Sequence, residues 1–474
     1  MRNRQRPAWG SIGLLALSGC SFAPDYHPPK AEIAPAFREE GPWREARPAD
    51  RAIAPDWWRA FGDPVLDRLQ AQVAASNTDL AIAMARYDQA RGGLTQTRSV
   101  ALPDVSIATD LTRNRQSADR PLRSAAQPTY YGAHAVEAQF GFELDLWGRI
   151  RNLIASGKAQ AEASADDVAE IRLSLQTELA RQYFALRGYD RQIAVLTQTV
   201  DAFAQADHLT RRRVSGGVAS ELDAARSGTL LAEARAQLAD VQSQRAQADH
   251  AIATLIGESA SRFTLAVDAG EPTMPVIPSG LPSTLLERRP DIAAAERRMF
   301  AANAQIGVAR AAFFPAIRLG GGIGYQATAL SGLMTAPNTL WSIGTSGLAP
   351  LFDGGRRRGS LAVAKARWSE ATASYRGKVL VAFQEVEDNL ASLHYLEDQL
   401  SAERDAVRQA AAGESLSVSK YTKGAAIYLD VITAQTTALR TRLALIGLET
   451  RHLQTSARLM TALGGGWSPD ARSG

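Results

Sequence analysis

The side chains that most often carry chemistry are sparse and scattered in this sequence. It contains one cysteine, Cys20, and six histidines, none of which forms a paired helical metal motif such as HExxH. It has no GxxxxGKS/T loop, and the stretch GGGIGY at 320–325 lacks the GxGxxG spacing of a nucleotide-binding turn. A single thiol excludes thiolate metal clusters. We therefore expect no enzymatic activity, no cofactor and no metal centre.

Cys20 points to a different chemistry, the covalent attachment of lipid. It follows Arg2, Arg4, Arg6 and a short apolar run, which is the residue order of a secretory signal. The run is too short for a transmembrane helix, which needs about 20 residues. LSGC at 17–20 resembles a bacterial lipoprotein box, whose cysteine becomes the acylated N-terminus, and Ser21 after it implies the outer membrane. A plain signal peptide with a chance cysteine is the alternative.

The charge of the mature chain gives no support to a nucleic-acid partner. Residues 1–19 carry three arginines and no acid, so their removal lowers the formal net charge from +4 to +1. The RRR runs at 211–213 and 356–358 are expected at solvated helix ends and in an interfacial charge belt.

Two acids recur at matching places in the two halves of the chain. The segments that begin at Gly217 and Gly424 align without gaps at an offset of 207, and Asp223 and Asp430 each follow the glycine by six residues. The shared positions are Gly217, Ala219, Leu222, Asp223, Thr229 and Arg235, matched by Gly424, Ala426, Leu429, Asp430, Thr436 and Arg442. This period is far longer than that of a solenoid, and it predicts an internal duplication of one large unit.

Long helices are expected over most of the chain. Proline is absent between Pro128 and Pro272 and between Pro350 and Pro469. In these stretches apolar residues recur at coiled-coil spacings of three and four. The seams are Leu186, Ile193, Leu196, Val200 and Phe203, and Val379, Phe383, Val386, Leu390 and Leu393. A helix from about Arg358 to Ala412 would be roughly 80 Å long, which implies an elongated helical body.

Segments of alternating hydrophobicity interrupt these helices. In AVEAQFGFELDLW at 135–147 every second residue is apolar, over the roughly 10 residues that an outer-membrane strand needs. PDVSIATDL at 103–111 is expected to pair with it. The loop between them carries four arginines and fits a solvent-facing hairpin end: Arg113, Arg115, Arg120 and Arg123. FFPAIRLGGGIGYQA at 313–327 and LWSIGTSGLAPLF at 340–352 predict a second pair.

Four strands per chain cannot close a membrane barrel, because an open edge is not tolerated in lipid. Two copies would give eight strands and three copies twelve. Strand number alone favours neither, whereas a long hollow helical body favours three. The predicted fold class is α+β, with long antiparallel coiled-coil helices and four strands per chain, internally duplicated.

Seven motifs together resemble one known family, the outer membrane factors of the TolC and OprM type, with their NodT-like lipoprotein branch. They are LSGC at 17–20, APDYHPP at 23–29, DWWRAFGDPVLDRL at 56–69, FELDLWGRIR at 142–151, LLERRPDIAAAE at 285–296, ARAAFFP at 309–315 and GAAIYLDVITAQ at 424–435. The resemblance covers nearly the whole chain. It implies a homotrimer with a 12-stranded outer-membrane β-barrel on a periplasmic α-helical tunnel.

The organisation expected on this basis has five parts. They are a lipoprotein signal peptide at 1–19, an extended N-terminal segment at 20–60, a first repeat at 61–270, a second repeat at 271–466 and a tail at 467–474. The implied partners are outer-membrane lipid, a periplasmic adaptor and an inner-membrane pump, expected to be of the RND type.

The matched acids are the candidate gate. The resemblance implies that the turns at Gly217 and Gly424 act as hinges at the periplasmic tip. In a trimer Asp223 and Asp430 would place six carboxylates around one opening and favour cations. Leu222 and Leu429 could add an apolar ring, and Thr433 stands where related ducts often carry an acid. The alternative is two solvated helix acids near an N-terminus.

Three functions remain open from the sequence. The first is an exit duct for drugs or solvents, and the second is the exit duct of a type I protein-secretion system. The third is a static coiled-coil spacer, which would not need an apolar strand face with Phe140, Phe142 and Leu144. Sequence does not separate the first two, because the pump chooses the cargo.

Overall fold

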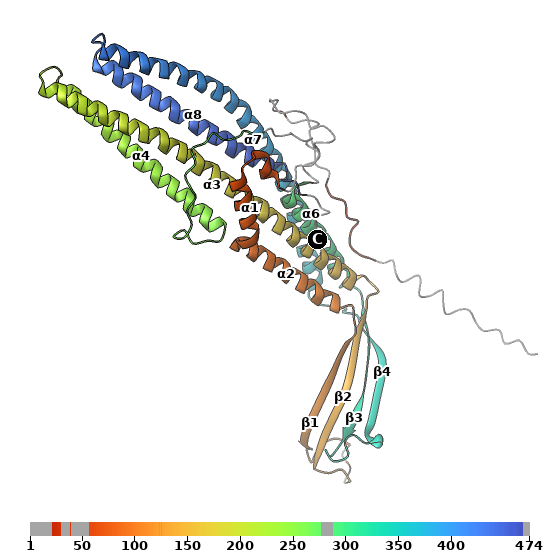
Figure 1. The fold of residues 1–474 in the computed structure, drawn as a ribbon. Helices are drawn as coiled ribbons and strands as arrows, with labels where there is room; N and C mark the ends of the chain where they lie inside the picture. Colours follow the sequence, from red (N-terminus) through yellow and green to blue (C-terminus); the bar gives the residue numbers. More distant parts are fainter. Residues whose placement is uncertain are drawn as a thin grey trace, which may run out of the picture. The chain divides into compact units, whose positions relative to one another are not determined.

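The computed structural model describes residues 21–29, 38, 56–122, 124, 126–275 and 288–467. Cys20 and the signal peptide lie outside the described residues. Figure 1 shows the elements in chain order. The first half contains η2 (Trp57–Phe61), α1 (Pro64–Ser76), α2 (Thr78–Ser99), β1 (Asp104–Arg115), β2 (Tyr130–Leu144), α3 (Arg149–Ser215) and α4 (Glu221–Leu255). The second contains α6 (Pro290–Ala311), β3 (Ala316–Ala327), η4 (Ala336–Asn338), β4 (Thr339–Leu348), α7 (Arg356–Thr422) and α8 (Tyr428–Ala462).

The two halves repeat one order of elements. In each, a helix leads into two strands, a helix of 67 residues and a helix of 35 residues. This confirms the internally duplicated α+β fold expected from the matched segments. In the first half α2 is preceded by α1, whose N-terminus is capped by the Asp63 carboxylate accepting from the backbone N–H groups of Val65 and Leu66.

The long helices bury several of the apolar residues that were expected to form coiled-coil contacts. Leu186, Leu196, Val386 and Leu390 are fully buried. At 1.5 Å per residue, α3 and α7 are each about 100 Å long. The expected helix from Arg358 to Ala412 was too short, because α7 continues through Gly413, whose Cβ position is open space, to Thr422.

The four strands form one antiparallel sheet in the order β1-β2-β3-β4, which confirms both expected strand pairs. Val105 pairs with Phe140, which pairs with Gly321, which pairs with Ile343. Because side chains alternate between faces, one face is mainly apolar. Its members include Val105, Ile107, Leu111, Val136, Ala138, Phe140, Phe142, Leu319, Ile323, Trp341 and Ile343. The opposite face carries Ser106, Asp110, Glu137, Gln139, Glu143 and Ser342.

The expected limits of strand β2 need one correction. The alternating pattern extends to Trp147, but the strand ends at Leu144. The Asp145 carboxylate accepts hydrogen bonds from the backbone N–H groups of Ile150 (3.0 Å) and Arg151 (2.8 Å). It therefore caps the start of α3, and this cap ends the extended backbone.

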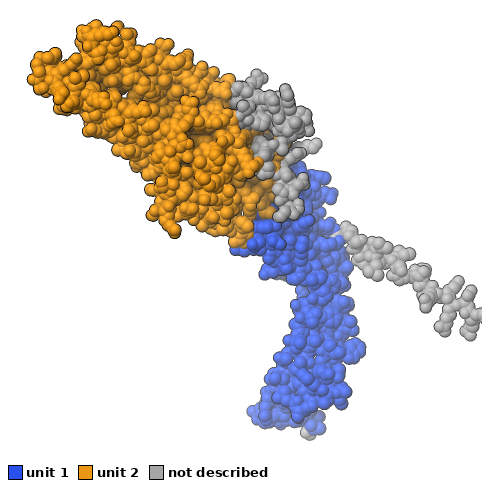
Figure 2. All heavy atoms as spheres, viewed as in Figure 1, with its two compact units in different colours: residues 1–30, 86–164, 294–375 blue, residues 31–85, 165–293, 376–474 orange. Residues whose placement is uncertain are grey.

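The chain divides into two compact units, coloured separately in Figure 2. Unit 1 is Met1–Lys30, Arg86–Ser164 and Ala294–Tyr375, and unit 2 is Ala31–Ala85, Ala165–Ala293 and Arg376–Gly474. Each unit takes segments from both sequence repeats, so a repeat is not a separate globule. In the part of the chain that the structure describes, no helix combines the length and apolar character needed to cross a membrane.

Residues 22–26 contact α6 within unit 1. The carbonyl oxygens of Phe22 and Pro24 accept hydrogen bonds from Arg310 (3.0 Å) and Asn303 (2.8 Å). The Phe22 ring stacks on Phe314 with centroids 4.6 Å apart, and the Tyr26 hydroxyl donates to the Glu296 carboxylate at 2.5 Å. The chain directly after Cys20 is thereby fixed to α6 by contacts at both its ends.

Candidate functional site

The two matched glycines end the two longest helices in the same way. Gly217 and Gly424 have φ values of 72° and 77°, which favour glycine. After α3, the N–H of Val218 bonds the carbonyl of Arg213 (2.8 Å) and Gly217 bonds Val214 (2.9 Å). After α7, Ala425 bonds Lys420 (2.8 Å) and Gly424 bonds Tyr421 (3.0 Å). Both turns are therefore Schellman motifs, and in Figure 1 they lie at the same end of unit 2. Their role as hinges stays a prediction.

The two matched acids occupy different environments. Asp223 is half-buried and forms a capping box with Ser220 at the start of α4: its N–H donates to the Ser220 hydroxyl (3.2 Å), which donates back to its carboxylate (2.8 Å). Asp430 is exposed in the first turn of α8, where Ile427 at the cap position provides no side-chain hydrogen bond. The Asp223 carboxylate is thus held by a helix cap, whereas the exposed Asp430 carboxylate lies beside a cap residue that offers it no hydroxyl.

Apolar side chains close to these acids in the sequence are exposed. Leu222 and Leu429, both expected there, are 57% and 41% exposed. Thr433 is exposed, and its hydroxyl donates to the Leu429 carbonyl at 2.9 Å. Sequence reasoning missed Val218 and Ile427, which are 79% and 64% exposed. Neither has an apolar counterpart of similar size in the other repeat, so the offset of 207 gave no signal for them.

Contacts between the two hairpins hold the tips of unit 2 together. The Arg213 guanidinium lies over the Tyr421 ring, 5.0 Å from its centroid, and that ring is 5.4 Å from Tyr428. The hydroxyl of Tyr428 is hydrogen-bonded to Thr210, and burial raises the pKa of this tyrosine. The sequence did not predict the contacts of Arg213 with Tyr421 and of Thr210 with Tyr428, because these partners are more than 200 residues apart.

A second group of contacts fixes α4 to α3 below the tip. Asp207 accepts hydrogen bonds from the Arg211 guanidinium and the Ser227 hydroxyl, both at 2.7 Å. The hydrogen bond from Arg211 lowers the pKa of Asp207 more than burial raises it. This carboxylate is therefore ionised near neutral pH.

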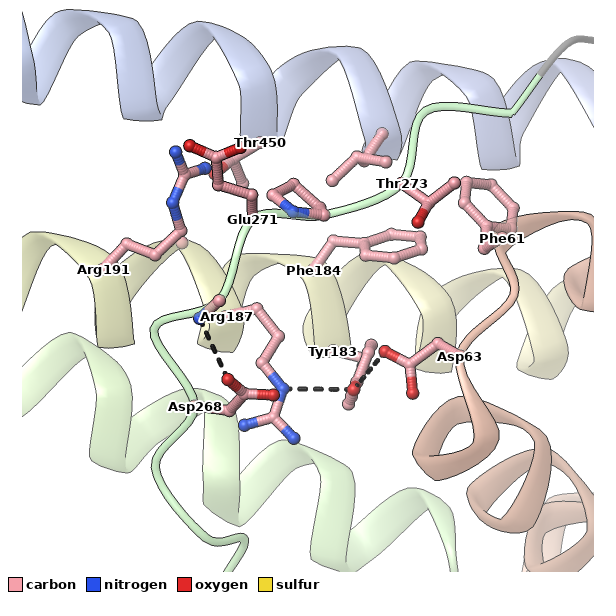
Figure 3. A pocket seen from close by; sticks show the side chains of 14 residues that line it. Phe61, Asp63, Tyr183, Phe184, Arg187, Arg191, Asp268, Glu271, Thr273 and Thr450 are labelled. Carbon is pink, nitrogen blue, oxygen red and sulfur yellow. Dashed lines mark hydrogen bonds between the residues drawn. The ribbon is translucent and has the colours of Figure 1, made fainter.

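A buried polar cluster lies deeper in unit 2, next to a small pocket (Figure 3). Asp190 is fully buried and accepts hydrogen bonds from Arg187 (3.1 Å), Arg245 (2.8 Å) and the backbone N–H of Asp268 (3.1 Å). Arg187 also donates to the hydroxyl of Tyr183 (3.1 Å), which donates to the Asp63 carboxylate (2.5 Å).

This cluster fixes the segment that follows α4. Arg187 and Arg245 donate to the carbonyls of Ala266 (2.8 Å) and Leu265 (2.7 Å). Burial, with the hydrogen bond to Asp63, raises the pKa of Tyr183. The pocket has a volume of about 90 Å³, well below the roughly 300–1,000 Å³ of typical ligand sites. The cluster is thus built to hold chain segments together. Among the described residues no group of three or more His, Cys, Asp or Glu side chains is arranged to hold a metal ion.

Comparison with known proteins agrees with these features. The profile of the family described as "Outer membrane efflux protein" matches residues 69–258 and 281–465. The outer membrane protein OprJ of Pseudomonas aeruginosa is 33% identical, over 98% of this chain and 97% of its own length. The toluene efflux pump outer membrane protein TtgC of Pseudomonas putida is 32% identical, over 96% and 95%.

Solved structures agree in fold as well as in sequence. The outer-membrane channel OprN superposes with a TM-score of 0.86 at 29% identity, covering 94% of this chain and 100% of that one. VceC of Vibrio cholerae gives a TM-score of 0.80 at 28% identity, covering 87% and 99%. The resemblance to outer membrane factors is thereby confirmed. The chain belongs to the outer membrane efflux protein family.

Proposed function

We propose that the protein is the outer-membrane exit duct of a tripartite efflux system. It conducts small toxic compounds passively, without catalysis. An RND-type inner-membrane pump supplies them through a periplasmic adaptor. Relatives named for toluene, solvent and antibiotic efflux support a small-molecule cargo over a secreted polypeptide. The gene neighbourhood tests the pump type, since an ABC exporter beside a large secreted protein would favour secretion instead.

The observation that carries this proposal is the four-stranded sheet with two open edges. Among the described residues, β1 and β4 each pair on one side only. The apolar face of the sheet is exposed: the exposed fractions of Val105, Ile107, Trp341 and Ile343 are 65–74%. On β3 the face runs from Ile317 to Tyr325, about 26 Å at 3.3 Å per residue, which matches the apolar band of membrane strands, about 25 Å tall. Since lipid tolerates no open edge, further copies must supply the missing partners.

The first prediction concerns assembly. We expect the full-length protein in detergent to be a homotrimer, whose twelve strands enclose a lumen wider than the side-chain-filled interior of eight. Mass photometry and native mass spectrometry measure the copy number directly. A monodisperse monomer would reject the barrel, and a dimer would reject the open lumen.

The second prediction concerns the lipid anchor on Cys20. We propose that acyl chains on this residue anchor the mature N-terminus, and the fixed position of residues 21–26 on α6 supports it, because Cys20 is bonded directly to Ser21. Wild-type protein is expected to incorporate a labelled fatty acid, and the Cys20→Ser variant none. Ser18→Ala serves as a control that leaves the thiol in place. Equal labelling of the Cys20→Ser variant would contradict the assignment.

The turns at Gly217 and Gly424 are proposed as the narrow periplasmic end of this duct. The exposed Asp430, the capping Asp223 and the exposed leucines beside them support a charged and apolar constriction. The contacts of Arg213, Tyr421 and Tyr428 then resist separation of the two hairpins.

A further inference from the structure

The apolar face of the sheet ends in two arginines on strand β1. Along this strand, Val105, Ile107 and Leu111 alternate onto the apolar face, and the same alternation places Arg113 and Arg115 there. The basic hairpin end was expected to face solvent. Two of its arginines, which are exposed, also continue the line of side chains that the proposed function assigns to lipid.

Contacts across the strand pair confirm the face of these arginines. Arg115 pairs with Tyr130 of β2, and its guanidinium lies 5.7 Å from the centre of the Tyr130 ring. Both arginines are exposed, and no carboxylate of the described residues lies within ion-pair distance of either. Asp119 is the only acid between Arg113 and Tyr130. These two guanidinium groups are therefore available to an outside anion.

Connectivity fixes which end of the strands carries them. β1 follows α2 and β2 leads into α3, so Arg113 and Arg115 lie at the hairpin end, away from the helix-joined ends. The other hairpin, residues 328–338, carries no charged residue. Each copy thus presents one cationic site, and it lies at the end opposite to the helices.

We propose that Arg113 and Arg115 bind the phosphate groups of the phosphorylated glycolipid in the outer leaflet of the outer membrane. The inference rests on the proposed function, in which the apolar face contacts acyl chains. Arg113 and Arg115 follow Leu111 by about 7 and 13 Å along the strand, which brings them from the acyl region to the headgroups. A guanidinium holds a phosphate through two parallel hydrogen bonds, and Tyr130 is an aromatic side chain suited to the same interface.

Phospholipid of the inner leaflet is a poorer match for Arg113 and Arg115. With the helices in the periplasm, the hairpin end faces the cell exterior, where the outer leaflet consists of glycolipid bearing phosphates on its sugar headgroup. Phospholipid of the inner leaflet would meet the helix-joined ends of the strands. The positive charge of the two arginines and their position at the outer-leaflet end of the strands both favour the glycolipid as the ligand.

The test is native mass spectrometry of the full-length protein in detergent, titrated with bisphosphorylated lipid A or with its dephosphorylated form. Wild-type protein is expected to bind the bisphosphorylated form at least about tenfold more tightly, since each basic side chain at an anionic lipid surface contributes about fivefold. The double variant Arg113→Gln with Arg115→Gln is expected to lose this preference. Arg318→Gln, which removes an arginine from the opposite face, is expected to keep it.

Four outcomes would overturn the proposal. They are equal binding of the two lipid A forms by wild type, an unchanged preference in the double variant, displacement by inorganic phosphate, and equally tight binding of phosphatidylglycerol. The same spectra report the copy number. A trimer without lipid A preference removes this inference alone, whereas a monomer removes the proposed function.

Discussion

Replacing Asp190 by alanine is expected to destabilise unit 2 by about 3–5 kcal/mol, the range found when one partner of a buried ion cluster is removed. Asp190 has no exposed surface, and it accepts hydrogen bonds from Arg187, Arg245 and the backbone of Asp268. Its loss leaves two largely buried guanidinium groups without their shared carboxylate. The segment after α4, which they hold at Leu265 and Ala266, loses these hydrogen bonds as well.

Asp201→Ala is the matched control, because Asp201 lies on the same helix but is exposed. An exposed substitution of this kind is expected to change stability by less than about 0.5 kcal/mol. Since membrane channels often unfold irreversibly, the rates of heat-induced loss of helical circular dichroism and of proteolysis at 263–275 are the readouts. If Asp190→Ala and Asp201→Ala unfold at the same rate, the cluster does not stabilise the fold.

The strands and helices were predictable because each has a local pattern. Alternation around Phe140 and Ile343 predicted the strands and their pairing, and spacings of three and four predicted the seams around Leu186 and Val386. The long-range polar contacts were not predictable. Asp190 and Arg245 are 55 residues apart, and only the folded helices bring them within 2.8 Å. No local period marks such a pair.

Position within the repeat predicted where the two matched acids lie but not what they contact. Asp223 and Asp430 occupy equivalent places in α4 and α8. The preceding cap residue differs, however, since Ser220 has a hydroxyl and Ile427 does not. The two repeats share the helix start, but only Asp223 forms a capping box. An alignment of the two repeats therefore overstates how alike the two carboxylates are.

The different surroundings of Asp223 and Asp430 predict that their substitutions affect ion selectivity to different extents. Changing both acids to asparagine is expected to lower the cation preference of the channel, because up to six carboxylates leave one opening in a trimer. The Asp223→Asn side chain retains an oxygen that can accept from the Ser220 N–H, so the cap should be weakened by less than the roughly 1 kcal/mol of a lost cap. Asp430→Asn alone should produce most of the change, since Asp430 is exposed and Asp223 is engaged with Ser220.

The reversal potential of single channels in planar bilayers under a salt gradient measures this preference. It is expected to move toward zero in the order wild type, Asp223→Asn, Asp430→Asn and the double variant. The shift should be largest at low salt, because the screening length falls to about 10 Å at 0.1 M. Asp398→Asn, an exposed acid on α7 that is 26 residues before Gly424, should leave the potential unchanged. A double variant with the wild-type potential would mean that these acids do not line the constriction, and that Asp223 serves only to cap α4.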